Sequence, residues 1–369
     1  MLKKSFVSVC LPLCAAFSIA VFSPGVQRAA AQSAAAQPSP PTAPQSDTAT
    51  FDADRTAHIT RIVPMPSTIS REAQDWLDSL TRRSHAPQTL EQRRTSTDEW
   101  RKRDSAEALK FYPAKVEETT TAGVRTDIIT PLAASAVNKN RVLINLHGGG
   151  FNSDSGSLIE GVPISNLAKI KVVSVYYRLA PENPFPAAVE DVVAVYKELL
   201  KTYQPKNIGI FGTSAGAILT GEVVAQLKKS GLPLPGAVGM FSVRPDYSRA
   251  TDSLQLFTLD GFPGSLEPTD PNHPPADAYV GSTNPKDPVL SPFFADSKNW
   301  PPSLFVTSTR DLLLSDTAMF HRALLRGGND TQLVVFEALP HAFWYHFQLP
   351  ETKECLEIMA KFFEDKLGR

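Results

Sequence analysis

A serine between two glycines is the strongest chemical signal in this chain of 369 residues. Residues Gly212–Gly216 read Gly-Thr-Ser-Ala-Gly, directly after an apolar run from Ile208 to Phe211 and before a helix-forming segment. In a nucleophile elbow, the serine occupies a sharp, strained turn between a strand and a helix, and its flanking residues must be small because the two elements approach closely. The pattern therefore predicts that Ser214 is a nucleophile and that the Ala215 N–H points toward a developing oxyanion.

A glycine run upstream of this serine could supply further oxyanion donors. His147–Phe151 read His-Gly-Gly-Gly-Phe and follow an apolar strand predicted over Arg141–Leu146. Three glycines after a strand leave several backbone N–H groups free to point into one small space. No Gly-Lys-Ser/Thr follows and no Gly-x-Gly-x-x-Gly pattern fits, which argues against a nucleotide site. We interpret His147 as a hydrogen-bonding brace for this loop rather than as a base.

A nucleophilic serine needs a base, which in this kind of sheet follows the serine in the chain. His341 is the preferred candidate, because Pro340–Phe343 form a loop just past the last predicted strand. His346 lies close by and is the second choice. The remaining candidates have structural explanations, in a proline-rich insertion or in the middle of a helix: His273 and His321.

The base in turn needs a carboxylate to orient it. Asp311 follows the strand predicted over Ser303–Thr307 by a few residues, which places it at the carboxyl edge of the sheet. We expect Asp316 to cap the next helix and Asp330 to be a turn residue. Asp311 is therefore the predicted acid of a Ser-His-Asp triad.

The elements that must position these residues alternate between strands and helices. The predicted strands are 116–119, 124–129, 141–146, 172–176, 208–211, 237–241, 303–307 and 333–336, and the predicted helices include 186–201, 215–228, 317–325 and 351–366. Such alternation predicts an α/β fold with a mostly parallel, doubly wound sheet. The interval 244–300, rich in Pro, Asp, Ser and Gly, is too long for an ordinary loop and is expected to carry short helices over the site.

The N-terminal part of the chain is expected to divide into three segments. Lys3 and Lys4 precede an apolar run that ends near a small-residue cleavage site at Ala31, which predicts a secretory signal peptide over 1–31 rather than an uncut anchor or a lipoprotein signal. Residues 32–50 are Ala, Pro, Ser, Thr and Gln except for Asp47 and predict a disordered linker. Residues 51–112 predict a helical cap with helices after Ser70 and over about 90–111, and 113–369 the catalytic domain.

Composition and cysteine content exclude several classes of protein. A net charge of -1 and 20% charged residues give no signal for nucleic acid or an anionic membrane. Of the 3 cysteines, two leave with the signal peptide. Cys355 alone can form neither an intramolecular disulfide nor a metal cluster, and its apolar-periodic setting predicts a buried packing residue.

Together these motifs resemble a known family over about 116–366. His-Gly-Gly-Gly-Phe, Tyr-Arg-Leu-Ala-Pro-Glu-Asn-Pro-Phe-Pro-Ala-Ala, Gly-Thr-Ser-Ala-Gly, Asp-Leu-Leu-Leu and Pro-His-Ala-Phe occur in the family's order, at 147–151, 177–188, 212–216, 311–314 and 340–343. The chain resembles the hormone-sensitive-lipase-like, bacterial family IV branch of the α/β-hydrolases. The resemblance implies carboxylesterase activity on short acyl chains, no metal or organic cofactor and an N-terminal cap.

The resemblance also bears on particular residues. It implies that Gly148, Gly149 and Ala215 are the oxyanion donors, and it leaves open whether Gly150 replaces Gly148. Many members carry Asp where this chain has Thr213, so the chain resembles the Gly-Thr-Ser-Ala-Gly subgroup. Many also carry Gly in place of Ala217, a change of one methyl group that the elbow should tolerate. The stretch 177–188 with Asp191 is expected to form a buried polar network that supports the site, through three charged residues: Arg178, Glu182 and Asp191.

We therefore expect an exported serine carboxylesterase, periplasmic or extracellular, that takes a small-molecule ester, with no stable membrane anchoring. The same triad could also act on a lactone, an amide or a sugar acetate. A third reading is a non-catalytic binding protein, because plant gibberellin receptors resemble this family without a working triad; the presence of His341 argues against it. By resemblance, edge pairing through 333–336 is a hypothesis for a homodimer.

Overall fold

The computed structural model describes residues 46–133, 136–154, 156–266 and 277–369, and they fall into two compact units. The predicted signal peptide, most of the predicted linker and His273 lie outside these residues. The described part of the first unit, which ends at Pro64, is an antiparallel hairpin of β1 (Thr48–Phe51) and β2 (Ala57–Thr60). Our expectation of linker up to residue 50 and of helical structure from residue 51 is wrong here. Ala49, Phe51, Ala57 and Ile59 share one face of the hairpin but are exposed, and the alternation extends over four residues in each strand, too short a run for our sequence analysis to have singled it out.

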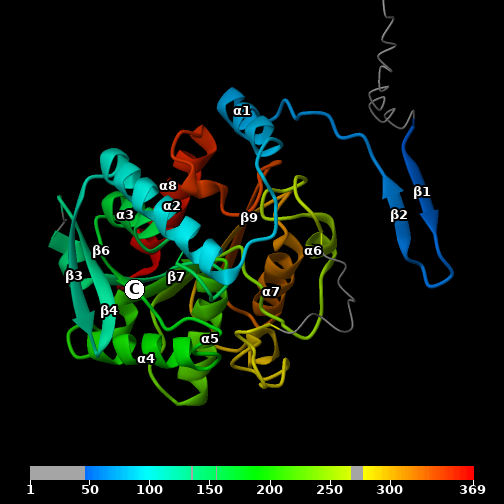
Figure 1. Cartoon of the computed structure of the whole chain (residues 1–369). Helices are drawn as coiled ribbons and strands as arrows, with labels where there is room; N and C mark the ends of the chain where they lie inside the picture. Colours follow the sequence, from blue (N-terminus) through cyan, green and yellow to red (C-terminus); the bar gives the residue numbers. More distant parts are fainter. Residues whose placement is uncertain (1–45, 134–135, 155, 267–276) are drawn as a thin grey trace, which may run out of the picture. The chain divides into compact units, whose positions relative to one another are not determined.

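The second unit, Met65–Arg369, is built on an eight-stranded sheet in the order β10-β9-β8-β7-β5-β6-β4-β3 (Figure 1). Its strands are β3 (Ala114–Thr121), β4 (Val124–Pro131), β5 (Val142–Leu146), β6 (Lys171–Val175), β7 (Ile208–Thr213), β8 (Ala237–Phe241), β9 (Ser303–Ser308) and β10 (Thr331–Phe336). Every neighbouring pair from β6 to β10 is parallel, whereas β4 is antiparallel to both β6 and β3. The predicted mostly parallel α/β fold is confirmed.

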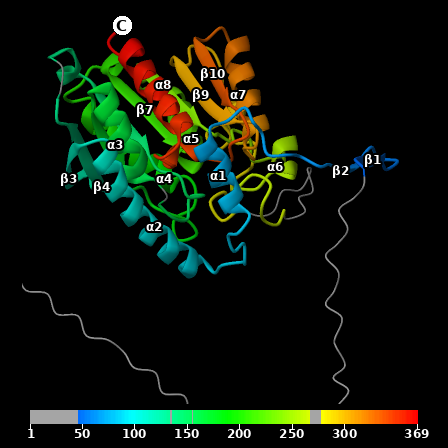
Figure 2. The same cartoon turned by 90° about the horizontal axis from the view of Figure 1, so that it is seen from above.

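Helices cover both faces of this sheet (Figure 2). One core contains residues of α4 (Ala187–Leu199), α5 (Ala215–Lys229) and α7 (Leu314–Arg326), and the other contains residues of α3 (Ser157–Ala168) and α8 (Pro350–Lys366). Successive strand residues supply opposite cores: Ile144 packs in the first and Leu143 in the second. The central strands are therefore buried on both sides, which explains why they read as continuous apolar runs.

Both segments predicted to form the cap contain helices, and those of the second segment are short, as expected. Those of the first segment are α1 (Arg71–Leu80), which the Ser70 side chain caps, and α2 (Leu90–Phe111), which begins with a capping box at Thr89 and Gln92. In the interval 244–300, the described residues hold the five-residue helix α6 (Asp252–Leu256) and the 3₁₀ turn Pro292–Phe294. No described helix is long and apolar enough to cross a membrane.

Helix α3 is a second element that our sequence analysis did not predict. Nine of its twelve residues are buried, and Pro163, a residue that usually ends a helix, lies inside it. The helix packs against the sheet, α2 and α8. A helix that is covered on several sides has no polar face and so lacks the periodicity of an amphipathic helix. Cys355 on α8 is a free, buried cysteine, as predicted, and burial raises the pKa of its thiol. Strand β10 (Thr331–Phe336) lies at one edge of the sheet, where a second copy could pair with it. The homodimer suggested by the resemblance stays a prediction.

Candidate active site

Ser214 lies in a strained turn between β7 and α5. Its backbone has φ 58° and ψ −120°, which a residue with a side chain rarely adopts, and its N–H donates to the Phe241 carbonyl at 2.9 Å. A Cβ on Gly212 would lie 2.3 Å from the Leu146 carbonyl oxygen, and one on Gly216 would lie 1.8 Å from it. Both flanking glycines are therefore needed for the close approach of β7 and α5 to the end of β5.

Asp311 and His341 form a buried pair at the same edge of the sheet. His341 Nδ1 lies 2.9 Å from Asp311 Oδ1, and the Asp311 side chain is fully buried. Asp311 also accepts hydrogen bonds from the Ser242 hydroxyl, from Thr307 Oγ1 at 2.8 Å and from the Leu313 N–H at 2.9 Å. With Asp311 as the acceptor, His341 Nδ1 carries a proton and Nε2 is the nitrogen left for proton transfer.

The charge state of Asp311 follows from these partners. Burial alone would raise its pKa, but the charge interaction with His341 and the hydrogen bonds from His341, Ser242 and the Leu313 N–H outweigh burial and lower the pKa below its usual value. Asp311 is therefore ionised at neutral pH and can stabilise a positive charge on the imidazole.

One cavity of about 660 Å³ brings the predicted nucleophile and base together. Ser214 and His341 both line it, and Gly149 and Gly150 form part of the same wall. Gly148, which the resemblance implied as a donor while leaving Gly150 open, is not among the residues that line this cavity. Residues from α2, from the connection between α1 and α2, and Leu259 of the interval 244–300 also line it. Both segments predicted as cap thus contribute walls.

The glycine loop has the geometry of a donor cradle. Gly149 has φ +106° and Gly150 has φ +61°, and a Cβ on Gly149 would lie 2.1 Å from the Ser153 carbonyl oxygen. The N–H groups of Gly149 and Gly150 donate to no acceptor among the described residues. Ala215 is the first residue of α5, where helix geometry leaves the N–H without an intrahelical partner.

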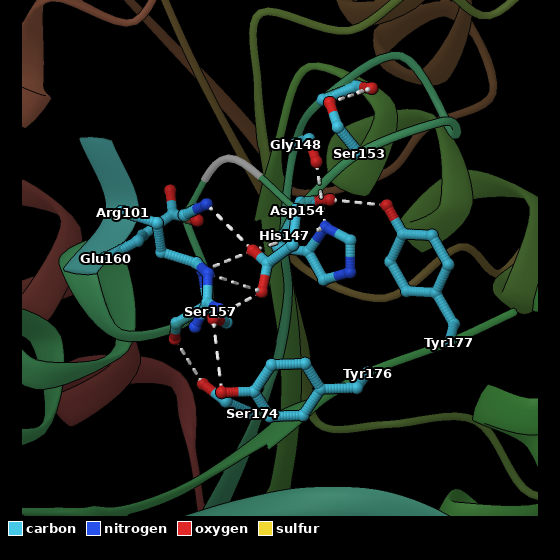
Figure 3. A network of polar contacts seen from close by, with 12 residues as sticks. Arg101, His147, Gly148, Ser153, Asp154, Ser157, Glu160, Ser174, Tyr176 and Tyr177 are labelled. Carbon is cyan, nitrogen blue, oxygen red and sulfur yellow. Dashed lines mark hydrogen bonds and ion pairs between the residues drawn. The ribbon is translucent and has the colours of Figure 1, made fainter. Parts of the chain in front are cut away.

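A polar network behind this loop fixes its shape (Figure 3). Asp154 accepts from the backbone N–H groups of Gly156 and Ser157, each at 3.1 Å, and from Ser157 Oγ at 2.7 Å. His147 Nδ1 donates to the Gly148 carbonyl at 2.8 Å, which agrees with its predicted role as a brace. Arg101 of α2 reaches the same carboxylate, with its Nε 3.5 Å from Asp154 Oδ2. The loop is therefore tied to the predicted cap as well as to the sheet.

The competing base candidates lie in settings unsuited to proton transfer at this site. His346 packs its ring 4.1 Å from that of Trp76, and burial together with the charges of nearby arginines lowers its pKa to about 3. His321 lies on α7 against Phe305, and burial lowers its pKa.

The competing acids also have other partners. Asp330 accepts from Lys366 Nζ at 2.6 Å. We expected Asp316 to cap α7, but this prediction is wrong: the N-cap is Leu313, and Asp316 lies inside the helix. Its carboxylate accepts from the Thr251 hydroxyl instead, and burial raises its pKa to about 7.

The predicted supporting network is only partly buried. Arg178 Nε donates to Asp191 Oδ1 at 2.9 Å, as expected. Glu182, however, has a side chain 55% exposed, and Arg94 of α2 holds it in a bidentate pair at 2.7 and 2.8 Å. A surface pair with a cap helix therefore replaces the expected buried contact.

Comparison with known proteins defines the family. A family model described as the α/β-hydrolase fold matches residues 143–345, more than half of the chain. The chain belongs to the α/β-hydrolase fold family. It is 32% identical to an acetyl-hydrolase of Streptomyces hygroscopicus over 235 residues, which cover 62% of this chain and 77% of that protein.

Solved structures narrow the family further. A crystal structure of an esterase, E25, superposes with a TM-score of 0.71 at 28% identity and covers 84% of this chain and 98% of its own. An esterase from the bacterial hormone-sensitive lipase family superposes with a TM-score of 0.67, also at 28% identity, over 81% of this chain and 99% of its own. The hormone-sensitive-lipase-like resemblance is thus confirmed, and the chain is a carboxylic ester hydrolase of the α/β-hydrolase family. Membership of the Gly-Thr-Ser-Ala-Gly subgroup stays a prediction.

In this α/β-hydrolase, a buried carboxyl group that the sequence did not single out lies behind the elbow. Glu160 of α3 accepts from the Thr213 hydroxyl and from Asn145 Nδ2 at 3.0 Å, and Trp344 Nε1 donates to Thr213 Oγ1 at 3.0 Å. Burial raises the pKa of Glu160 to about 8, although its hydrogen bonds act in the opposite direction. The only hint of a carboxyl group here in the sequence was Thr213, at the position where, as the resemblance implies, many family members carry Asp. Here the carboxyl group comes from a neighbouring helix.

Among the described residues, no group of three or more His, Cys, Asp or Glu side chains is placed to hold a metal ion. The arrangement can carry out acyl transfer with a serine nucleophile, a histidine base and backbone donors alone.

We predict that Glu160 makes stability fall as pH rises. The ordinary pKa of 4.5 applies in the unfolded chain and about 8 in the fold, so between these values the folded protein binds more protons than the unfolded chain. The free energy of unfolding should therefore decrease with rising pH across this window, by up to about 1.4 kcal/mol per pH unit. Glu160→Gln should remove the Glu160 contribution to this decrease, as measured by urea denaturation of both proteins at several pH values.

The comparison of the two proteins isolates Glu160, because Asp316 and the other buried acids titrate in both. A difference in the free energy of unfolding between wild type and Glu160→Gln that stays constant across the window would contradict the prediction.

Proposed function

We propose that the protein is an exported serine carboxylesterase that hydrolyses short-chain acyl esters with Ser214, His341 and Asp311 as its triad. The observation that carries this proposal is the cavity that Ser214 and His341 share. Nδ1 of His341 is hydrogen-bonded to Asp311, which is buried and ionised, so Nε2 is left to act on the serine. The esterase names of the relatives support the reaction type, and the triad assignment rests on this geometry.

The reaction follows from these positions. His341 Nε2 takes the hydroxyl proton as Ser214 Oγ attacks the ester carbonyl carbon, and the carbonyl π electrons move to oxygen. The tetrahedral intermediate collapses, the alcohol leaves with the proton from His341, and Ser214 keeps the acyl group. Water then attacks the acyl-enzyme with the same base, releases the acid and restores the serine. Asp311 holds the imidazole in the required tautomer throughout.

The oxyanion would lie between the glycine loop and the start of α5. The free N–H of Gly149 and the position of Ala215 support two of the donors implied by the family resemblance. For the third, the cavity wall favours Gly150 over Gly148. Each such donor contributes roughly 3–4 kcal/mol to transition-state stabilisation in serine hydrolases.

The size and lining of the cavity support small substrates. Its volume, about 660 Å³, lies in the usual range for small-molecule sites. Trp100, Leu259 and Tyr345 give it apolar walls that suit a short acyl chain. The name of the Streptomyces relative, an acetyl-hydrolase, agrees with a small acyl group.

We predict a preference for short acyl chains that depends on the triad. The mature chain from Gln32 should hydrolyse p-nitrophenyl acetate and butyrate with a higher kcat/KM than the octanoate and palmitate. Ser214→Ala should lower kcat by about 10⁴-fold or more, and Asp311→Asn by about 10⁴-fold. Ser230→Ala, at the far end of α5, is the matched control and should retain wild-type activity.

Turnover that survives Ser214→Ala would show that another group is the nucleophile. A folded wild type that hydrolyses none of these esters would overturn the short-chain ester assignment, and lactone, amide and sugar-acetate substrates would then be assayed.

We also propose export, on the sequence of residues 1–31 alone. Expressed in full in a Gram-negative host, the protein should be recovered from the periplasm or the medium with an intact mass that corresponds to a chain starting near Gln32. Recovery from the cytoplasm with the first 31 residues retained would contradict this proposal.

A further inference from the structure

Arg93 brings into the active-site cavity a positive charge that has no partner among the described residues. It lies in the first turns of α2 and lines the same cavity as Ser214 and His341. Its guanidinium makes no ion pair and no side-chain hydrogen bond with any described residue. Burial lowers its pKa, and no carboxylate contributes an opposing effect.

The other arginines of α2 show how unusual this is. Arg94 pairs with Glu182 at 2.7 Å, Arg101 lies 3.5 Å from Asp154, and Arg103 pairs with its neighbour Asp104 at 2.7 Å. Each of these three charges has a carboxylate from the chain itself, and Arg93 is the arginine of α2 that faces the cavity without one.

The formally charged side chains in the described lining of the cavity are both basic. Its described lining contains two arginines and no Asp or Glu. The second arginine, Arg83, is neutralised by Asp260, with Nη1 3.2 Å from Oδ1. Arg93 therefore carries the uncompensated charge. A partly desolvated guanidinium is unfavourable until an anion binds to it, and its fork of donors matches the two oxygens of a carboxylate.

The guanidinium lies beside the groups proposed to bind the ester carbonyl. A Cβ built on Gly150 would lie 3.4 Å from Arg93 Nη2. A carboxylate a few bonds away from an ester carbonyl held at the glycine loop can therefore reach Arg93 within the same cavity.

We propose that Arg93 is a specificity-determining residue that selects short esters carrying a carboxylate close to the scissile bond. The inference rests on the proposed triad chemistry and adds a substrate class to it. The carboxylate can belong to the acyl part, as in a monoester of a short dicarboxylic acid, or to the alcohol part. Both place the same anion at the same guanidinium.

The test compares charged and neutral esters of matched size. On the acyl side, mono-p-nitrophenyl glutarate is compared with p-nitrophenyl pentanoate; on the alcohol side, 4-acetoxybenzoate is compared with 4-acetoxybenzamide. Uncatalysed rates are subtracted. The wild type should give the higher kcat/KM for the anionic member of at least one pair. Arg93→Gln should lower that charged-to-neutral ratio by about tenfold or more, chiefly through KM.

Two further variants separate a binding role from a structural one. Arg93→Lys keeps the charge without the planar fork and should restore part of the ratio. Lys102→Gln makes the same change of charge at an exposed position of the same helix and should leave the ratio unchanged.

Equal loss for charged and neutral esters in Arg93→Gln, or a wild type that does not prefer the anion in either pair, would overturn the proposal. Failure of the proposed function looks different: the neutral esters would not be hydrolysed by wild type, or their hydrolysis would survive Ser214→Ala.

Discussion

The site depends on how closely β7 and α5 approach the end of β5. The Leu146 carbonyl occupies the space where side chains on Gly212 and Gly216 would lie. Leu146 is also the last residue of β5, directly before the glycine loop. One tight crossing therefore fixes the strained serine and the oxyanion loop relative to each other. Because β9 and β10 run parallel to these strands, the loops that carry Asp311 and His341 leave the sheet at the same edge.

Two buried carboxyl groups close to this crossing are held in opposite states. Asp311 faces a histidine, a hydroxyl and a backbone N–H that favour its charged form, and its pKa is lowered. Glu160 has hydrogen bonds from neutral groups alone, so burial prevails and its pKa rises to about 8. In the proposed mechanism, the charged acid lies where positive charge would develop on His341, and the mostly neutral acid lies behind the elbow, where a fixed negative charge would oppose formation of an oxyanion.

Much of the fold and the principal site residues could be predicted from the sequence, because they depend on local signals. Glycines that must lack side chains, apolar runs of strand length and the order Ser, Asp, His are all visible in the chain. They led to Ser214, Asp311 and His341, which the structure gathers at one edge of the sheet. The family resemblance implied Gly148 and Gly149 as donors and left Gly150 open; Gly149 and Gly150 line the cavity, whereas Gly148 does not.

What escaped prediction depends on partners far apart in the chain. Helix α3 has no polar face because other elements cover it, and the strands of the 48–60 hairpin alternate over four residues each, too few to give a clear period. The pairing of Glu160 with Thr213 joins residues 53 positions apart. The isolation of Arg93 becomes visible once its neighbours on α2 have been matched to their carboxylates. Such contacts have no signature in a single sequence, because the chain does not say which charges meet.

Covalent labelling tests the central claim, that Ser214 is the nucleophile activated by His341, most directly. The mature chain would be treated with diethyl p-nitrophenyl phosphate and analysed by intact mass and peptide mapping. We predict one diethylphosphoryl group per chain, attached to Ser214, together with loss of esterase activity and no adduct in Ser214→Ala. An adduct on another residue, or full inhibition with Ser214 unmodified, would contradict the account.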